Sequence, residues 1–182
     1  YEIGTGADQI NLRTDVAFDL TASVWENDST VKYCTLFEPT ATNIVNAVSG
    51  SEIVASLGEL SGSIPYTCFI ARENYIEDHS DVVEKFLTAV KRAYSYIVTN
   101  DSYAVAQALL PSFDGNTVEE LQIAVEQYVA INAWSSNMIM SSQSFDNLMN
   151  VMLNAGVITE KSVFSEVVDN TYVENLLEES VA

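Results

Sequence analysis

The segment from Gly58 to Pro65 is the feature that most limits how this chain can fold. It reads Gly-Glu-Leu-Ser-Gly-Ser-Ile-Pro, a mixture that interrupts both helices and strands. Before it, short apolar runs alternate with stretches of helical spacing, and after one further apolar run the spacing is helical. Two differently built parts must therefore be joined here, and the segment is a candidate hinge or lobe crossing. It lacks the Gly-Lys-Ser/Thr ending of a phosphate-binding loop.

The N-terminal part predicts strands that alternate with helices. The predicted strands are residues 10–14, 32–37 and 52–57, with a further strand at 66–72. One helix is predicted near residues 17–25 with Asp15 as its cap, and another runs from Pro39 to about Val48. Strands separated by helices favour a largely parallel sheet, so this part predicts an α/β fold.

The C-terminal part predicts amphipathic helices. The predicted starting points are Ser80 for a helix over 81–99, Asp101 or Ser102 for one ending before Pro111, Thr117 with a capping box to Glu120, and Ser141 or Ser142 for one closed by Gly156. Short helical pieces are predicted from there to the end of the chain.

Charge excludes one large class of functions. Seven Lys and Arg stand against 26 Asp and Glu, a formal net charge of -19, which repels the phosphate backbone of nucleic acids. No apolar run approaches the roughly 20 residues that cross a bilayer. Because the first residue is Tyr1 and not Met, we expect upstream sequence to have been removed, and any export signal or lipid anchor would lie there.

The residues that usually carry metals or catalysis are few. Cys34 and Cys68 each lie in a predicted strand, and we expect two buried thiols, although an oxidising compartment would permit a bridge. The single His79 cannot complete a zinc site of the usual kind and is expected to be exposed at a helix start. No Gly-x-Ser-x-Gly elbow occurs. The sequence therefore predicts neither a metal nor a cofactor, and no enzyme.

Several motifs together resemble a known family. They are Thr14-Asp15-Val16-Ala17-Phe18, Thr35-Leu36-Phe37-Glu38-Pro39-Thr40-Ala41, Ser61-Gly62-Ser63-Ile64-Pro65-Tyr66-Thr67, the run Val-Val-Glu-Lys-Phe-Leu-Thr-Ala that ends at Ala89, Gly156-Val157-Ile158 and Val167-Val168-Asp169. In order and spacing they resemble the ABC-transporter substrate-binding proteins for nitrate, sulfonates, taurine and thiamine pyrimidines.

The resemblance implies a type-2 periplasmic-binding-protein fold, in which two α/β lobes are joined by crossing strands and hold the ligand between them. On this basis residues 1–60 form part of lobe 2, residues 61–72 the hinge crossing and return strand, and residues 73–182 the mainly helical C-terminal part of lobe 1. The N-terminal half of lobe 1 has no counterpart, so the fold is expected to be truncated. Exposed apolar surface would follow, which a homodimer or strand exchange could cover.

Ligands of open α/β sheets bind beyond the carboxyl ends of strands, near helix N-termini. The candidate ligand-binding residues are Asp15, Phe37, Glu38, Thr40, Ser61, Gly62, Ser63, Tyr66 and Trp134. Phe37 could stack on a flat ligand, Glu38 could accept from a ring amine, and Thr40 could donate from the helix start. Equally, Phe37 could be core and Glu38 a helix cap. The segment at 61–66 could be an ordinary turn, and Trp134 a core aromatic.

The resemblance implies a non-catalytic, extracytoplasmic solute receptor whose lobes close on a small organic or anionic solute and deliver it to an ABC permease. A pyrimidine-like thiamine precursor is one expected solute if Phe37 stacks; nitrate, bicarbonate, taurine or another sulfonate remain open. One alternative is a ligand-sensing or interaction module of the same fold. Another is a pyrimidine-synthase-like enzyme, whose Cys-rich motif and catalytic histidine have no counterpart in this sequence.

Overall fold

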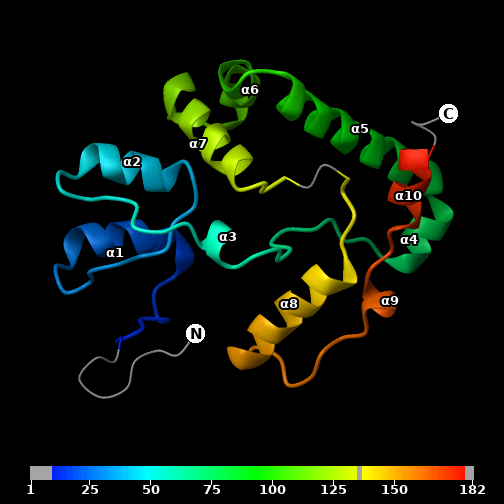
Figure 1. The fold of residues 1–182 in the computed structure, drawn as a ribbon, viewed down its shortest axis with the longest axis horizontal. Helices are drawn as coiled ribbons and strands as arrows, with labels where there is room; N and C mark the ends of the chain where they lie inside the picture. Colours follow the sequence, from blue (N-terminus) through cyan, green and yellow to red (C-terminus); the bar gives the residue numbers. More distant parts are fainter. Residues whose placement is uncertain (1–9, 135–136, 179–182) are drawn as a thin grey trace. The chain divides into compact units, whose positions relative to one another are not determined.

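The computed structural model describes residues 10–134 and 137–178. The chain divides into two compact units, Tyr1–Ile53 and Val54–Ala182, which are described separately below. Over the described ranges, the regular elements are α-helices and short 3-10 helices, and no strand is present (Figure 1). None of the helices in those ranges has the length and apolar character that a membrane span requires.

Over residues 10–53, the first unit contains two short α-helices and one 3-10 turn. Its elements are η2 (Phe18–Leu20), α1 (Thr21–Asn27) and α2 (Thr40–Ala47). These match the two helices predicted for this part of the chain, although Pro39 takes the N-cap position and not the first helical turn. Thr42 is buried, and the rings of Phe18 and Phe37 pack with their centroids 5.0 Å apart. The aromatic pair connects η2 to the residues that lead into α2.

The second unit is helical. Its elements are α3 (Leu57–Leu60), α4 (Glu73–Asp78), α5 (Ser80–Thr99), α6 (Ser102–Leu109), η3 (Leu110–Ser112), α7 (Val118–Ala130), α8 (Ser142–Asn154), α9 (Phe164–Val167) and α10 (Thr171–Glu178). Within this unit α6 packs on α7, α10 lies against α5, and α9 lies beside α8. The predicted helices are confirmed, whereas α3 and α4 were not predicted.

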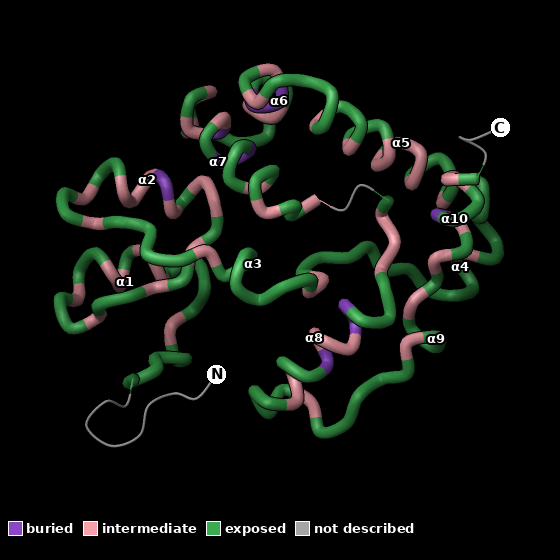
Figure 2. Tube along the Cα trace, in the orientation of Figure 1, coloured by how far each residue is buried: buried purple, intermediate pink, exposed green. Residues whose placement is uncertain are grey.

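The best-packed part of the second unit is the α6–α7 pair. The two helices are in contact, and the buried residues are Val105 and Ala106 of α6 and Leu121, Ala124 and Val125 of α7; Figure 2 shows buried positions in both helices. Spacings of three and four residues place the α7 members on one face of that helix. Burial of apolar surface is the main favourable term in folding, so this pair supplies most of the buried apolar residues of the unit, alongside Phe145, Met149 and Val173.

Side-chain caps explain where the main helices begin. The Asp101 carboxylate accepts from the Ala104 N–H at 2.8 Å, and Thr117 and Glu120 form the predicted capping box. Ser141 accepts from the Ser144 N–H at 3.1 Å. The Ser80 cap is wrong: Ser80 is the first residue of α5, and His79 occupies the N-cap without a side-chain bond. Asp15 is also no cap, because its carboxylate binds Arg13.

The four strands predicted at residues 10–14, 32–37, 52–57 and 66–72 are wrong for the described residues. Residues 32–37 and 66–72 carry no helix or strand, and α3 begins at Leu57. An apolar run predicts an extended backbone, but a strand also needs a neighbour whose N–H and C=O groups complete the ladder. No such neighbour exists in the described ranges, so these segments remain unpaired with any strand.

The extended segment 66–72 exposes apolar side chains. Tyr66, Phe69 and Ile70 are 76%, 70% and 90% exposed, so the exposed apolar surface expected from the sequence is present here. The prediction of two buried thiols is wrong, because Cys68 in this segment is exposed and Cys34 is only half-buried. Both cysteines are free thiols. Burial of Cys68 depended on a sheet that the described residues do not form.

Candidate ligand-binding residues

The candidate ligand-binding residues are divided between the two units. Asp15, Phe37, Glu38 and Thr40 belong to the first unit, and Ser61, Gly62, Ser63, Tyr66 and Trp134 belong to the second. The structure therefore defines two local arrangements, and each is described by itself. That both line one site remains a prediction.

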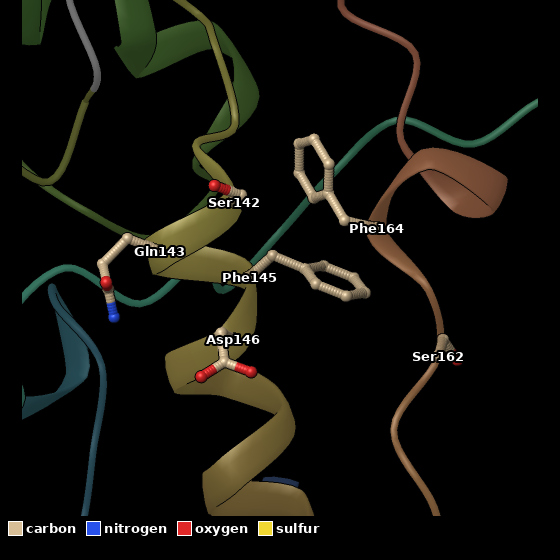
Figure 3. Close-up of a pocket in the computed structure, with 6 residues that line it drawn as sticks. All are labelled: Ser142, Gln143, Phe145, Asp146, Ser162 and Phe164. Carbon is tan, nitrogen blue, oxygen red and sulfur yellow. The ribbon is translucent and has the colours of Figure 1, made fainter.

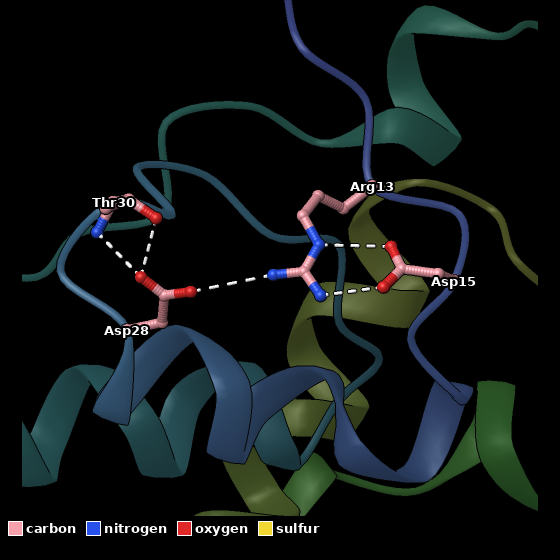
Figure 4. Close-up of polar contacts among 4 residues, drawn as sticks. All are labelled: Arg13, Asp15, Asp28 and Thr30. Carbon is pink, nitrogen blue, oxygen red and sulfur yellow. Dashed lines mark hydrogen bonds and ion pairs between the residues drawn. The ribbon is translucent and has the colours of Figure 1, made fainter.

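In the first unit, Asp15 is held by a residue that the sequence analysis did not select. Arg13 donates from Nε and Nη2 to the two Asp15 carboxylate oxygens at 3.0 and 2.7 Å (Figure 4). Its Nη1 lies 3.5 Å from an Asp28 oxygen, and the other Asp28 oxygen accepts from the Thr30 hydroxyl at 2.6 Å. A bidentate pair fixes the plane of both groups. One guanidinium thus orders the loop at 13–15 against the end of α1.

These contacts lower the pKa of both carboxyl groups. Hydrogen bonds from Arg13 lower the pKa of Asp15 from its usual 3.8 to about 2. The pKa of Asp28 is also lowered, first by the Thr30 hydroxyl and then by the Thr30 backbone N–H. Both groups therefore carry a negative charge at neutral pH, and the Asp15 charge is neutralised locally by Arg13.

Phe37, Glu38 and Thr40 lie together where the chain enters α2. The Phe37 ring packs on Phe18 with one part still exposed, and Thr40 is the first residue of the helix. The Glu38 carboxylate accepts from the Thr42 N–H at 3.1 Å. Glu38 therefore satisfies a free donor of the first helical turn, as the alternative interpretation of this residue expected. Phe37 retains the exposed area that a stacking role requires.

In the second unit, residues 58–66, called the glycine-rich segment below, are hydrogen-bonded to α8. Ser61 ends α3, and Gly62 follows with φ of +70°, a conformation that glycine adopts without strain. The Ser63 carbonyl accepts from Asn147 Nδ2 of α8 at 3.1 Å. Tyr66 extends from the same segment into solvent. The positions of Ser61, Gly62 and Ser63 therefore follow from the end of α3, the positive φ of Gly62 and the hydrogen bond to Asn147.

Trp134 follows the end of α7. Its ring meets Tyr128 edge to face with centroids 5.6 Å apart, and the side chain is half-buried. Near the same helix end, Gly58 of α3 lies so close to Ile131 that a Cβ at position 58 would sit 2.6 Å from Ile131 Cδ1. The start of the glycine-rich segment and the end of α7 are therefore in contact.

Two surface depressions lie away from the predicted ligand-binding residues. One, of about 360 Å³, lies between α8 and the residues before α9, where Phe145 and Phe164 face each other (Figure 3). Another, of about 390 Å³, lies between α5 and α10 around Lys85 and Arg92. No predicted ligand-binding residue lines either depression. Across the described ranges, no cluster of His, Cys, Asp and Glu has the arrangement of a metal site.

Sequence reasoning missed two residues that shape these arrangements. Arg13 stands two positions before Asp15, and that spacing in a loop could have suggested the ion pair. Asn147 gave no signal, because its partner Ser63 lies 84 residues away in the sequence.

Comparison with known proteins gives two matches. The family described as "NMT1/THI5 like" matches residues 44–104. The Bacillus subtilis (strain 168) protein named "Putative binding protein YtlA" is 25% identical over 170 residues, which are 93% of this chain and 50% of that protein. The predicted resemblance to substrate-binding proteins is confirmed. The chain spans about half the length of this relative, and no solved structure gives a significant match.

The family match covers only part of the candidate residues. Ser61, Gly62, Ser63 and Tyr66 lie inside residues 44–104, together with α4 and α5. The candidates of the first unit and Trp134 lie outside it. Within the matched range, the glycine-rich segment is therefore the part that carries the predicted ligand contacts.

Proposed function

We propose that this chain is part of the non-catalytic, extracytoplasmic solute-binding component of an ABC importer. The observation that carries the proposal is the similarity to a binding protein across 93% of the chain. In the proposal the full-length protein has two α/β lobes of the type-2 periplasmic-binding-protein fold, and a small solute binds between them. Closure of the lobes about the segment at 61–72 then presents the loaded form to a permease.

The exposed segment 66–72 supports the two-lobe arrangement. A run with the composition of a buried strand, such as Tyr-Thr-Cys-Phe-Ile, gains its stability from strands on either side. Phe69 and Ile70 are exposed in this chain, and the relative is about twice as long as the matched region. We propose that further strands of the full-length protein pair with this segment and convert it into part of a sheet.

The charges of the first unit favour one class of solute. Residues 1–53 contain two cationic side chains, Arg13 and Lys32. Arg13 is engaged by Asp15 and Asp28, and Lys32 Nζ donates to the Ser29 carbonyl at 2.7 Å. To bind Arg13 or Lys32, nitrate or a sulfonate would have to displace the oxygen atoms that these cations already contact. An uncharged or amine-bearing flat organic molecule, stacked on Phe37, needs no such exchange.

A thermal-shift panel on the full-length protein tests this proposal. The compounds are thiamine pyrimidines, taurine, other alkylsulfonates, nitrate, bicarbonate and riboflavin, with this 182-residue chain measured in parallel. A compound at 100 times its dissociation constant adds about 2.7 kcal/mol to the free energy of unfolding, a shift of several degrees. We expect a pyrimidine-type compound to stabilise the full-length protein and to have a smaller effect on this chain.

A matched pair of variants identifies the stacking residue. Phe37→Ala removes the proposed stacking surface and should abolish the thermal shift, whereas Tyr33→Ala removes an aromatic that is 78% exposed and should leave the shift unchanged.

Stabilisation by nitrate or a sulfonate alone would contradict the proposed solute class. No stabilisation by any compound in a folded full-length protein would favour a sensor or interaction module, and conversion of a panel compound would establish an enzyme.

A further inference from the structure

Helix α8 holds the glycine-rich segment at one point. The extended chain after α3 runs past α8, and Asn147 Nδ2 of that helix donates to the Ser63 carbonyl at 3.1 Å (Figure 1). The partner is a backbone atom, so the bond restrains the path of the chain and not a side chain. Ser63 lies between Gly62 and Tyr66, both of which are candidate cleft residues.

The Asn147 side chain is itself oriented by its own helix. Gln143 Nε2, one turn earlier, donates to Asn147 Oδ1 at 3.1 Å. Because the amide oxygen accepts this bond, the amide nitrogen must point to the other partner, which is the Ser63 carbonyl. Gln143 and Phe145 extend from opposite sides of α8 (Figure 3), and Asn147 lies one turn after Gln143.

Asn147 belongs to a helix whose other face is packed. Phe145 and Met149 are buried, and Phe145 packs on Phe164 with ring centroids 5.5 Å apart. Ser141 caps the helix. A short side chain on a packed and capped helix loses little entropy when it forms a hydrogen bond, so Asn147 is suited to hold a partner in place.

The glycine-rich segment is also fixed at its other end. Gly58 lies beside Ile131 at the end of α7, where a Cβ at position 58 would displace the Ile131 Cδ1 methyl, and the Ser56 hydroxyl caps α3 through the Glu59 N–H at 3.3 Å. Between the two fixed points lies Gly62, with φ of +70° and open space where a Cβ would be. Gly62 itself meets nothing at the place of a Cβ, so the contacts that restrain this part of the chain lie on either side of it and leave Gly62 free to rotate.

We propose that Asn147 is a positioning residue that holds the cleft-bordering segment 61–66 through the Ser63 carbonyl and leaves Gly62 as the point about which the segment can rotate. The inference rests on the proposed function, since it assumes that this segment joins the lobes. Loss of the Asn147 bond removes the restraint after Gly62, and the segment then samples more conformations. Asn147 thereby influences the balance between open and closed forms without touching the solute.

Nuclear magnetic resonance relaxation of this chain tests the role of Asn147. Asn147→Asp keeps the shape and removes the donor; Asn147→Ala removes the donor without adding charge. We expect the backbone order parameters of Ser63 and Ile64 to fall from about 0.85, typical of rigid backbone, towards about 0.6 in both variants. Asn150→Ala is the matched control for Asn147→Ala, because the Asn150 amide donates within α8 to Asp146 at 3.2 Å.

The denaturant midpoint separates positioning from general stability. This midpoint should be the same in Asn147→Ala and Asn150→Ala, because each removes one exposed hydrogen bond and the loss is local. Unchanged order parameters at Ser63 and Ile64 in both Asn147 variants, or an equal fall in the Asn150 control, would overturn the inference. The measurement needs no solute, so its failure is distinguishable from failure of the thermal-shift panel.

Discussion

The α6–α7 pair and the extended segment 66–72 both consist largely of apolar and small residues, yet the structure treats them in opposite ways. In the helix pair Val105, Leu121 and Val125 are buried. In the extended segment Phe69 and Ile70 are exposed. The difference lies in where each segment finds its partners. A helix satisfies its own backbone and needs a neighbour only for one face, whereas a strand needs neighbours for its backbone as well.

The helix pair is the part of the chain that can stabilise itself. The two helices of the pair are separated in the sequence only by η3 and a short turn, and both carry side-chain caps at their starts. The extended segment has no strand beside it in the described ranges. We therefore expect the stability of the 182-residue chain to depend on the helix pair. The segment 66–72 contributes the edge-to-face contact of Phe69 with Phe86 of α5, at 4.7 Å between ring centroids, and should contribute more when further strands are present.

The largest effect is expected from truncation in the helix pair. Leu121 is 2% exposed, and Leu121→Ala should lower the free energy of unfolding by about 3 kcal/mol through lost burial and the cavity left behind. Ile70→Ala removes a side chain that is 90% exposed and should change it by less than about 0.5 kcal/mol. Denaturant unfolding followed by circular dichroism measures both.

The comparison fails if the two variants behave alike. A loss for Ile70→Ala as large as that for Leu121→Ala would mean that the segment 66–72 is packed in solution. In the full-length protein the proposed function expects that result, since the segment would then lie within a sheet. The same pair of variants in the two proteins therefore tests both the comparison and the proposed fold.

A smaller effect is expected from the cap of α7. The Thr117 hydroxyl accepts from the Glu120 N–H at 3.2 Å, and the Glu120 carboxylate accepts from the Thr117 N–H at 2.7 Å. Thr117→Ala leaves a donor of the first turn unsatisfied and should cost about 1 kcal/mol. The control is Thr99→Ala at the end of α5, where the hydroxyl donates to the Ser95 carbonyl and caps no free N–H. Equal losses in the two variants would show that the capping box contributes nothing particular to the helix pair.

The helices could be predicted from the sequence because their signals are local. Asp101, Thr117 and Ser141 each cap a helix within three residues, and the apolar spacing of α5 and α8 lies within the helix itself. The strands could not be predicted, because whether an extended run is paired depends on residues elsewhere. Helix α4 was missed since it follows directly on the predicted strand at 66–72, with Arg72 as its N-cap.

The contacts of the candidate residues could likewise be predicted where both partners are close in the sequence. That Glu38 would cap α2 could be foreseen as an alternative, because its partner Thr42 is four residues away. The Asn147–Ser63 bond spans 84 residues and could not be foreseen from spacing. The Arg13–Asp15 pair is local, but reasoning from a predicted strand at 10–14 made Asp15 a helix cap and left Arg13 without a role. The wrong strand prediction at 10–14 thus led to the wrong role for Asp15.

The Arg13–Asp15 pair provides a pH test in the first unit. The folded pKa of Asp15, about 2, lies below its usual 3.8, so the pair stabilises the fold above about pH 4 and this contribution is lost as the pH falls towards 2. Arg13→Gln should raise the pKa of Asp15 towards the usual value. It should affect Asp28 less, because the Thr30 hydroxyl and backbone N–H are the main causes of the lowered pKa there. Carboxyl carbon chemical shifts measure both titrations, and an unchanged Asp15 curve would contradict the pairing.

The smallest effect we predict is a difference in the rate of thiol modification. Cys68 lies exposed in the segment 66–72, whereas Cys34 is half-buried and its burial raises the pKa of the thiol. Since the thiolate is the reactive form, Cys68 should be labelled about three- to tenfold faster near neutral pH. Mass spectrometry of labelled Cys34→Ser and Cys68→Ser variants assigns each rate. Cys68 labelling no faster than Cys34 would mean that the segment is covered in solution, and the contrast with the helix pair would then disappear.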